Sequence, residues 1–172
     1  KVGTLEDDAD ATDVTAINMT AATTLRIAEE FTNIVAIKEA SGDLSQCMGL
    51  IAGRKALDLE DRFSILSGDD NLGVAQMAIG FDGIISVAAN AIPAPFSEMI
   101  RFARASKMQE ARSIHYRWLD VMDLHFAEGN PAGVKYSLEL EGVCGPSVRL
   151  PLVHASEGLR KRLGTAWAKA SV

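Results

Sequence analysis

The sequence contains few of the residues that build disulfide, metal or membrane sites. It has two cysteines, three histidines and five prolines among 172 residues, and no run of 18 apolar residues. Cys47 and Cys144 lie far apart and form no CxxC pair, so we expect reduced, buried thiols. The pattern predicts no membrane-spanning helix, and the opening residues show no apolar signal-peptide core.

Positive charge is also scarce, with 17 Lys and Arg against 23 Asp and Glu, a net charge of −6 and a pI near 5.1. A nucleic-acid-binding protein would show a basic face, so this balance argues against that class. The acidic composition, with 48% hydrophobic residues, predicts a globular cytoplasmic protein with a sizeable core. The chain is short for a complete (β/α)8 barrel, which needs about 250 residues.

Alternating strands and helices dominate the first half of the sequence. Residues 1–14 are crowded with carboxylates and predict an irregular acidic segment. Three short apolar runs then predict buried strands, each followed by a helix, and this order is typical of parallel βαβ units. The expected strands cover residues 34–38, 63–67 and 83–88, and the expected helices cover 20–31, 44–52 and 71–79.

Helical spacing dominates the second half. The expected helices cover residues 94–105, 108–127, 131–141 and 156–170, and 149–152 is expected to be extended. The fold class is therefore α/β, with a helical bundle after the last strand. The domain prediction is 1–14 irregular, 15–92 a partial barrel, and 93–172 a helical domain.

Lys38 is the residue of greatest chemical interest, because it ends an apolar strand and functional groups gather at the carboxyl ends of parallel strands. Burial of an ammonium group is unfavourable, so a lysine in such a place tends to lose its proton. The free amine can attack a ketone and form an imine, which acts as an electron sink. The alternative is a lysine whose charged end reaches solvent.

Asp69 and Asp70 follow the second expected strand and allow three interpretations: a helix cap, a metal ligand or a substrate contact. Capping is favoured, with Asp70 as the expected cap. Metal binding has little support because no histidine lies nearby. The three histidines, His115, His125 and His154, fall outside the strand ends and are interpreted as structural.

Four motifs in order resemble the dihydrodipicolinate synthase family of pyruvate-dependent Schiff-base lyases. They begin at Asn33 (NIVAIKEASGD), Ser67 (SGDD), Gly83 (GIISV) and Gly129 (GNPAGVK), and Leu150 (LPLV) matches the closing segment. The similarity covers about residues 15–165. It implies the C-terminal part of a (β/α)8 TIM barrel, about strands six to eight, followed by a C-terminal helical bundle.

The resemblance also implies a function. The family condenses pyruvate with aspartate semialdehyde in lysine (diaminopimelate) biosynthesis, without a cofactor or metal. Lys38 would form the pyruvate imine, Gly68 and Ile85 would shape the substrate pocket, and Asp69 would lie near the incoming aldehyde. The alternatives are a sister pyruvate aldolase acting on N-acetylneuraminate or a keto-deoxy sugar acid, and a non-catalytic half-barrel.

The sequence departs from the family just before Met19. Where the family carries Tyr-Asn-Val-Pro-Gly-Arg-Thr, residues 9–15 retain only the final threonine, so the proton-relaying tyrosine and the carboxylate-binding arginine are absent from that register. Strands one to four are absent as well, which predicts a truncated chain. Open strand edges predict self-association into a homo-oligomer, or pairing with a complementary half-barrel.

Overall fold

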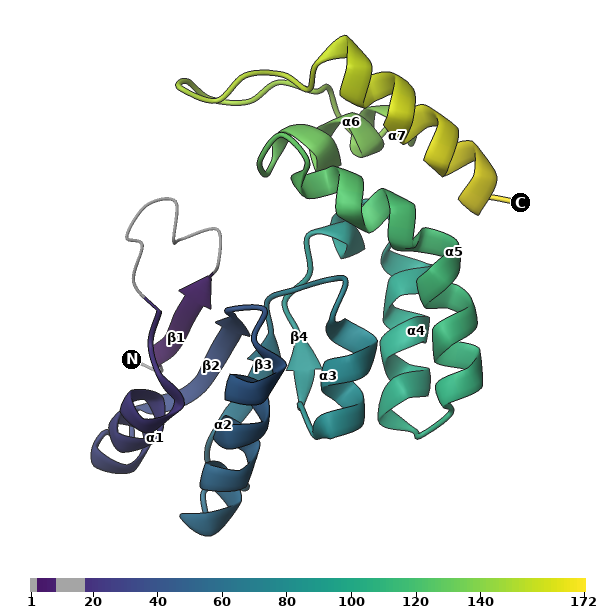
Figure 1. The fold of residues 1–172 in the computed structure, drawn as a ribbon. Helices are drawn as coiled ribbons and strands as arrows, with labels where there is room; N and C mark the ends of the chain where they lie inside the picture. The colour runs from purple at the N-terminus through teal and green to yellow at the C-terminus, as the bar shows by residue number, and fades with distance from the viewer. Residues whose placement is uncertain (1–2, 9–17) are drawn as a thin grey trace. The chain divides into compact units, whose positions relative to one another are not determined.

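The computed structural model describes residues 3–8 and 18–172, and the chain divides into two compact units at Ile85 and Ser86 (Figure 1). Unit 1 ends at Ile85 and holds a parallel sheet with its helices. Unit 2 begins at Ser86 and is helical. The expected boundary at residue 92 separates barrel from helical domain, and it remains a prediction.

Unit 1 is built on a four-stranded parallel sheet in the order β1-β2-β3-β4. The strands are β1 (Gly3–Asp8), β2 (Ile34–Ala40), β3 (Ser64–Ser67) and β4 (Gly83–Ile84). Ile37 of β2 pairs with Ile65 of β3, and both side chains are completely buried. The predicted βα alternation and the existence of the three predicted strands are therefore confirmed, while β2 extends two residues past the predicted end at Lys38 and β4 is shorter than predicted.

The prediction of an irregular acidic start is wrong for Gly3–Asp8, which forms strand β1 in parallel with β2. The physical reason is that the exposed edge of β2 carries unpaired backbone N–H and C=O groups. Pairing with a neighbouring strand satisfies those groups, whatever the side-chain charge. The remaining residues of the predicted segment lie outside the described part of the chain.

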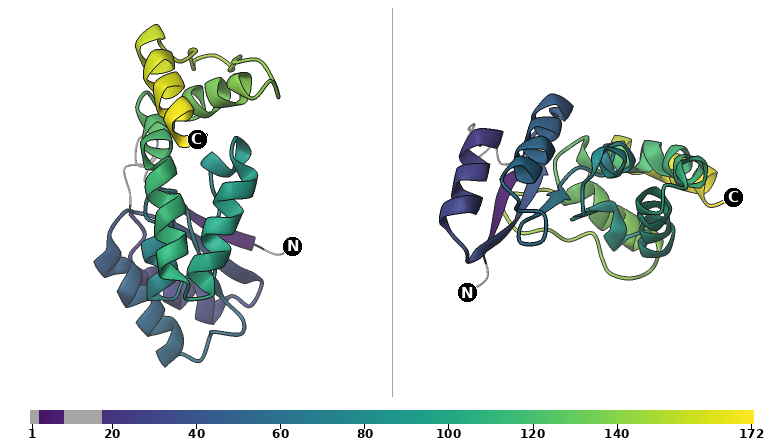
Figure 2. Two further views of the ribbon diagram at one scale, coloured as in Figure 1. Left: turned by 90° about the vertical axis from the view of Figure 1, so that its right-hand side faces the viewer. Right: turned by 90° about the horizontal axis from the view of Figure 1, so that it is seen from below.

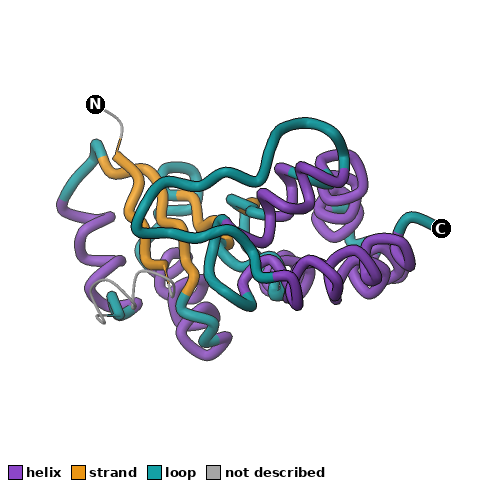
Figure 3. Tube along the Cα trace, turned by 90° about the horizontal axis from the view of Figure 1, so that it is seen from above, coloured by secondary structure: helices purple, strands orange, loops and turns teal. Residues whose placement is uncertain are grey.

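Three helices follow the strands, and local capping residues set where two of them begin. They are α1 (Ala21–Glu30), α2 (Leu44–Ala56) and α3 (Gly73–Ile79). Thr20 Oγ1 accepts the Thr23 N–H, and the Asp43 carboxylate accepts the Ser45 N–H at 2.8 Å. α1 and α2 cover the same face of the sheet (Figures 2 and 3). Side-chain oxygens thus satisfy backbone donors that a helix start leaves unpaired.

A buried arginine connects α2 to the β3–α3 part of unit 1. The Arg54 side chain is 7% exposed and forms an ion pair with Asp82. Arg54 Nη1 also donates to the Phe63 carbonyl at 3.1 Å, and Asp82 Oδ2 accepts the Ile65 N–H at 2.7 Å. The two side chains therefore neutralise each other's charge and also hydrogen-bond to the backbone at the amino end of β3.

Unit 2 consists of a short 3-10 helix, η2 (Ala88–Asn90), and four α-helices. These are α4 (Pro93–Arg104), α5 (Met108–Phe126), α6 (Ala132–Leu140) and α7 (Glu157–Ala170), which confirm the four predicted helices. α4 and α5 pack side by side (Figures 1 and 2). Trp118 of α5 and Trp167 of α7 meet edge to face, with ring centroids 5.3 Å apart.

Three expectations for loops and turns are corrected. The strand expected over 83–88 ends at Ile84, because Ser86 Oγ accepts the Ala89 N–H and turns the backbone into η2. Residues 149–152 form a turn closed by Leu152 N–H and Arg149 O, and are not extended. Both cysteines are free, but Cys144 is exposed because it lies in the loop between α6 and α7.

His125 holds α5 against α6 as a buried, neutral imidazole, which agrees with its predicted structural role. Its Nε2 lies 2.9 Å from Ser137 Oγ, and burial lowers its pKa to about 4. Gly133 of α6 makes the close packing possible, because a Cβ there would lie 2.7 Å from the His125 carbonyl oxygen. The contact therefore combines a polar bond with a close approach of two helix backbones.

This imidazole predicts a specific loss of stability in acid. In the unfolded chain a histidine has a pKa near about 6.5, so from about pH 6.5 down to about pH 4 the unfolded state binds a proton that the folded state excludes. We expect His125 to lower the free energy of unfolding by about 3 kcal/mol across that window. Urea unfolding of wild type and His125→Gln between pH 4 and 7 measures this. Identical pH slopes in the two proteins would contradict it.

Candidate active site

The candidate site lies at the carboxyl ends of β2 and β3 in unit 1, where Lys38 lies beside Gly68. Lys38 is half-buried, and the Gly68 N–H donates to the Glu39 carbonyl at 2.8 Å, which holds the two strand ends together. A Cβ at Gly68 would lie 2.9 Å from Lys38 Cε, 3.1 Å from Lys38 Cγ and 2.6 Å from Ala40 Cβ. The lysine stem therefore runs directly over the glycine.

Replacing Gly68 with alanine is expected to disturb this arrangement. The new methyl group meets Ala40 Cβ, which cannot rotate away, so the ends of β2 and β3 must separate. Overpacking of this kind lowers stability by about 1–3 kcal/mol. Gly145→Ala is a matched control, because nothing lies within 4 Å of a Cβ there. Thermal unfolding of both variants measures the difference, and equal stability would show that Gly68 has room for a side chain beside Ala40.

Asp69 takes part in a turn before α3. Its N–H donates to Ser67 Oγ at 3.0 Å, and its Oδ1 accepts the Asn71 N–H at 3.0 Å. The Asp69 carboxylate receives backbone donors ahead of this helix. The expectation that Asp70 caps the helix is corrected, because Leu72 is the N-cap residue of α3 and no side chain caps it. Asp70 is buried, at 1% exposed. A contact between Asp69 and a substrate remains a prediction.

Ile85 follows β4 at the next strand end of the sheet. Its N–H donates to the Ser67 carbonyl at 2.8 Å, and its side chain is 43% exposed. Strand pairing thus brings the backbones of Lys38, Gly68 and Ile85 to the same edge of the parallel sheet. Their roles as imine-forming and pocket-forming residues remain predictions.

Glu39 is a residue at this site that sequence reasoning did not single out. It is 1% exposed, and its carboxylate accepts the Ser41 N–H at 2.8 Å and Gln46 Nε2 at 3.1 Å. The Gln46 amide is in turn paired with Asn18, whose Nδ2 donates to Gln46 Oε1 at 2.8 Å. The available signal was a carboxylate inside an apolar strand, directly after the lysine.

Cys47 lies in α2, one residue after Gln46, and has the properties of an inert thiol. It is completely buried, and Gln76 Nε2 lies 3.6 Å from its Sγ. Burial raises the pKa of the Cys47 thiol, and the Glu39 and Asp43 carboxylates act in the same direction. A thiol held neutral is a poor nucleophile, so Lys38 is the better candidate for covalent chemistry in unit 1.

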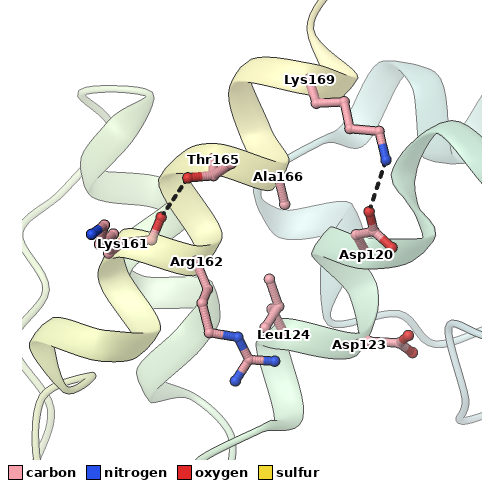
Figure 4. Close-up of a pocket in the computed structure, with 8 residues that line it drawn as sticks. All are labelled: Asp120, Asp123, Leu124, Lys161, Arg162, Thr165, Ala166 and Lys169. Carbon is pink, nitrogen blue, oxygen red and sulfur yellow. Dashed lines mark hydrogen bonds and ion pairs between the residues drawn. The ribbon is translucent and has the colours of Figure 1, made fainter.

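Unit 2 contains a separate open groove of about 550 Å³ between α5 and α7 (Figure 4). Lys169 Nζ donates to Asp120 Oδ2 at 3.2 Å across it, and both side chains are exposed. Charges of both signs pair there in water, which is typical of a solvated helix surface. The groove therefore supplies no candidate for catalysis.

Two classes of site receive no support in the part of the chain that the structure describes. Within residues 3–8 and 18–172, no three His, Cys, Asp or Glu side chains gather to hold a metal. No described helix has the length and apolar character that crossing a bilayer requires.

The parallel strand–helix order, with a half-buried lysine at one strand end, defines a fragment of the TIM-barrel class. Solved structures agree: dihydrodipicolinate synthase from Thermotoga maritima matches 98% of this chain and 55% of its own with a TM-score of 0.90 and 29% identity. The Aquifex aeolicus enzyme matches the same shares with a TM-score of 0.87 and 32% identity.

The sequence comparisons are more specific. A model of the Dihydrodipicolinate synthetase family matches residues 10–170, and the chain belongs to this family. The 4-hydroxy-tetrahydrodipicolinate synthase of Parabacteroides distasonis is 45% identical over 81% of this chain and 45% of its own length. That of Cytophaga hutchinsonii is 44% identical over 90% of this chain and 50% of its own. The chain thus spans about half the length of these relatives.

Proposed function

We propose that this chain carries the pyruvate-binding lysine of a 4-hydroxy-tetrahydrodipicolinate synthase, and that Lys38 is that lysine. The observation that carries the proposal is the placement of Lys38, half-buried near the carboxyl end of β2 and two residues before Ala40, with its stem over Gly68. Membership of the family supports the same assignment. The proposed substrates are pyruvate and aspartate semialdehyde.

The proposed chemistry follows from the amine. In its unprotonated form, the Lys38 amine attacks the ketone carbon of pyruvate. The addition product then takes up one proton from the solvent and loses water, which leaves a protonated imine. The imine nitrogen draws electrons from the neighbouring methyl group, which loses a proton and becomes an enamine. The enamine carbon then attacks the aldehyde carbon of aspartate semialdehyde and forms the new carbon–carbon bond. Gly68 and Ile85 would shape the pocket, and Asp69 would lie near the aldehyde.

The proposed barrel position supports a proposal about partners. We assign β2, β3 and β4 as strands six, seven and eight of the barrel, with β1 as the fifth and the helices of unit 2 as helix eight and the C-terminal bundle. In the described sheet, β1 and β4 each have a single neighbouring strand. Unpaired parallel edges favour association with a complementary half-barrel or a second copy. A cytoplasmic location also remains a prediction.

Trapping of the pyruvate imine, the first half-reaction, is the decisive test of the proposal. Borohydride reduces a pyruvate imine to a stable secondary amine, so incubation with pyruvate and borohydride should add one reduced pyruvate to the peptide that contains Lys38. Tandem mass spectrometry locates the adduct. A folded sample, verified by circular dichroism, in which Lys38 stays unmodified at saturating pyruvate would overturn the proposal.

The second half-reaction addresses the rest of the site. Residues 9–15, where the family's tyrosine and arginine motif would fall, lie outside the described part of the chain. General acid–base assistance is worth about 10²–10⁴-fold in rate. We therefore expect pyruvate capture to survive in this chain better than condensation with aspartate semialdehyde. Equal retention of both half-reactions, measured by trapping and by semialdehyde consumption, would contradict this expectation.

A further inference from the structure

Glu39 is an unusual residue for the layer between the sheet and its helices. The neighbouring residue that points to the same side of β2 is Ile37, which is completely buried. Glu39 is 1% exposed at an equivalent position two residues further along the strand. Burial of a carboxylate is unfavourable, and an apolar side chain would fill the layer at lower cost. Core packing alone therefore does not account for a glutamate here.

Both oxygens of the Glu39 carboxylate accept hydrogen bonds from groups close to Lys38. One oxygen accepts the Ser41 N–H, which holds the first residue after β2. The other accepts Gln46 Nε2 from the first turns of α2. The same Nε2 also lies within hydrogen-bond distance of the Met19 carbonyl, at 3.3 Å. Glu39 thus ties the end of β2 to the start of α2 and to the segment that leads into α1.

Lys38 and Glu39 are adjacent in sequence and lie on opposite faces of β2. The Lys38 stem lies against Gly68 on one face, and the Glu39 carboxylate lies against Gln46 on the other. A rotation of β2 about its axis moves both side chains together. The hydrogen bonds of Glu39 therefore restrict this rotation, and with it the direction in which the Lys38 side chain leaves the strand.

We propose that Glu39 is a positioning residue for Lys38, acting through Gln46 and the Ser41 N–H to hold the amine in line with the pyruvate carbonyl. The inference rests on the proposed function of Lys38 and names a residue whose own side chain does not touch the substrate. Misplacement of a reacting group by about 1 Å can cost about 10²-fold in rate. Glu39 thus contributes through geometry, and the expected loss falls on the rate of imine formation.

The experiment measures borohydride trapping of pyruvate as a function of pyruvate concentration in four proteins. These are wild type, Glu39→Leu, the exchange Glu39→Gln with Gln46→Glu, and Asp43→Ala. Glu39→Leu removes the acceptor of the Ser41 N–H and one of the three acceptors of Gln46 Nε2, which keeps Met19 O and Asn18 Oδ1. The exchange restores an acceptor for the Ser41 N–H and a bond between positions 39 and 46, because the amide at position 39 accepts from Ser41 and donates to a carboxylate at position 46. It removes the donor to the Met19 carbonyl and to Asn18 Oδ1. Asn18 Nδ2, which pairs with Gln46 Oε1, can donate to that same carboxylate.

Asp43→Ala is the matched control for stability. The Asp43 carboxylate accepts the Ser45 and Gln46 backbone N–H groups at the start of α2, whereas Glu39 accepts the Gln46 side chain. Removal of the Asp43 carboxylate weakens the same helix terminus and leaves the Glu39 carboxylate in place. Thermal unfolding of each protein provides the stability against which the trapping rates are compared.

We expect the maximal trapping rate to fall about 10- to 100-fold in Glu39→Leu, with a smaller change in the pyruvate concentration at half-saturation. The exchange should recover at least half of the lost rate on a logarithmic scale, and Asp43→Ala should stay within about threefold of wild type. If Glu39→Leu fails to fold, Gln46→Leu replaces it, because it removes one of the two donors and keeps the glutamate.

Each outcome decides a different point. A wild-type protein that traps no pyruvate overturns the proposed function, and this inference with it. Wild-type trapping with an equal rate in Glu39→Leu, or in its replacement Gln46→Leu, overturns the positioning role alone. An equal loss in Asp43→Ala, or no recovery in the exchange, shows that the glutamate acts only through stability and also overturns the inference.

Discussion

Lys38→Arg is expected to abolish the pyruvate adduct while leaving the fold intact. Arginine keeps the positive charge and the long aliphatic stem that lies along Gly68. Its guanidinium stays protonated and offers no free amine, so it cannot form an imine. This is the largest effect that we predict, because the reaction has no other route to an electron sink. Mass spectrometry after borohydride reduction reads it directly.

Four exposed lysines provide an internal control for that experiment. They are Lys55, Lys107, Lys161 and Lys169. Adducts spread evenly over these residues would mean that borohydride traps random encounters with pyruvate. An adduct confined to Lys38 in wild type, and absent from Lys38→Arg, would identify a specific site. Persistence of the adduct in the variant would remove Lys38 from the mechanism.

Arg54→Met is expected to lower the free energy of unfolding by about 3 kcal/mol. The change removes the ion-pair partner of Asp82 and the donor to the Phe63 carbonyl, while methionine fills part of the space. Asp82 is 37% exposed, so water compensates part of the loss, and the expected value lies at the lower end for buried pairs. Urea denaturation of the folded chain measures it.

Arg26→Met is the matched control for Arg54→Met. Arg26 forms an ion pair with Glu30 at 3.9 Å, and the two side chains are 71% and 56% exposed. Such a surface pair contributes about 0–1 kcal/mol. We therefore expect the control to stay close to wild type. If both variants lost the same free energy of unfolding, the buried ion pair of Arg54 would contribute no more than an exposed one.

The order of elements could be predicted from the sequence because it depends on local patterns. The β-branched run at Ile34–Ile37 and the helical spacing of α4 to α7 are visible in single windows of the chain. β1 was missed because its pairing depends on the exposed edge of β2, which lies some thirty positions further on. The acidic composition is a property of the side chains, whereas β1 forms through backbone hydrogen bonds to β2.

The candidate site could likewise be predicted only where it depends on local sequence patterns. Lys38 and Gly68 could be placed at strand ends from the apolar runs, and parallel pairing brings these ends together. Ile85 lay inside the expected strand 83–88, and its place in the pocket was implied only by the family resemblance. The link between Glu39, Gln46 and Asn18 was not visible, because it joins a strand, a helix and a loop whose proximity exists only in the folded chain. The expected Asp70 cap was also wrong, since α3 begins at Gly73 with Leu72 at its N-cap.

The opposite orientations of Lys38 and Glu39 limit how β2 can change in evolution. Insertion or deletion of one residue within the strand ahead of Lys38 would exchange their faces, placing the amine against the helices and the acid on the opposite face of the sheet. Both groups would lose their surroundings in a single event. We therefore expect length variation among descendants of this chain to fall in the connections before Ile34 or after Ala40, and to spare the strand itself.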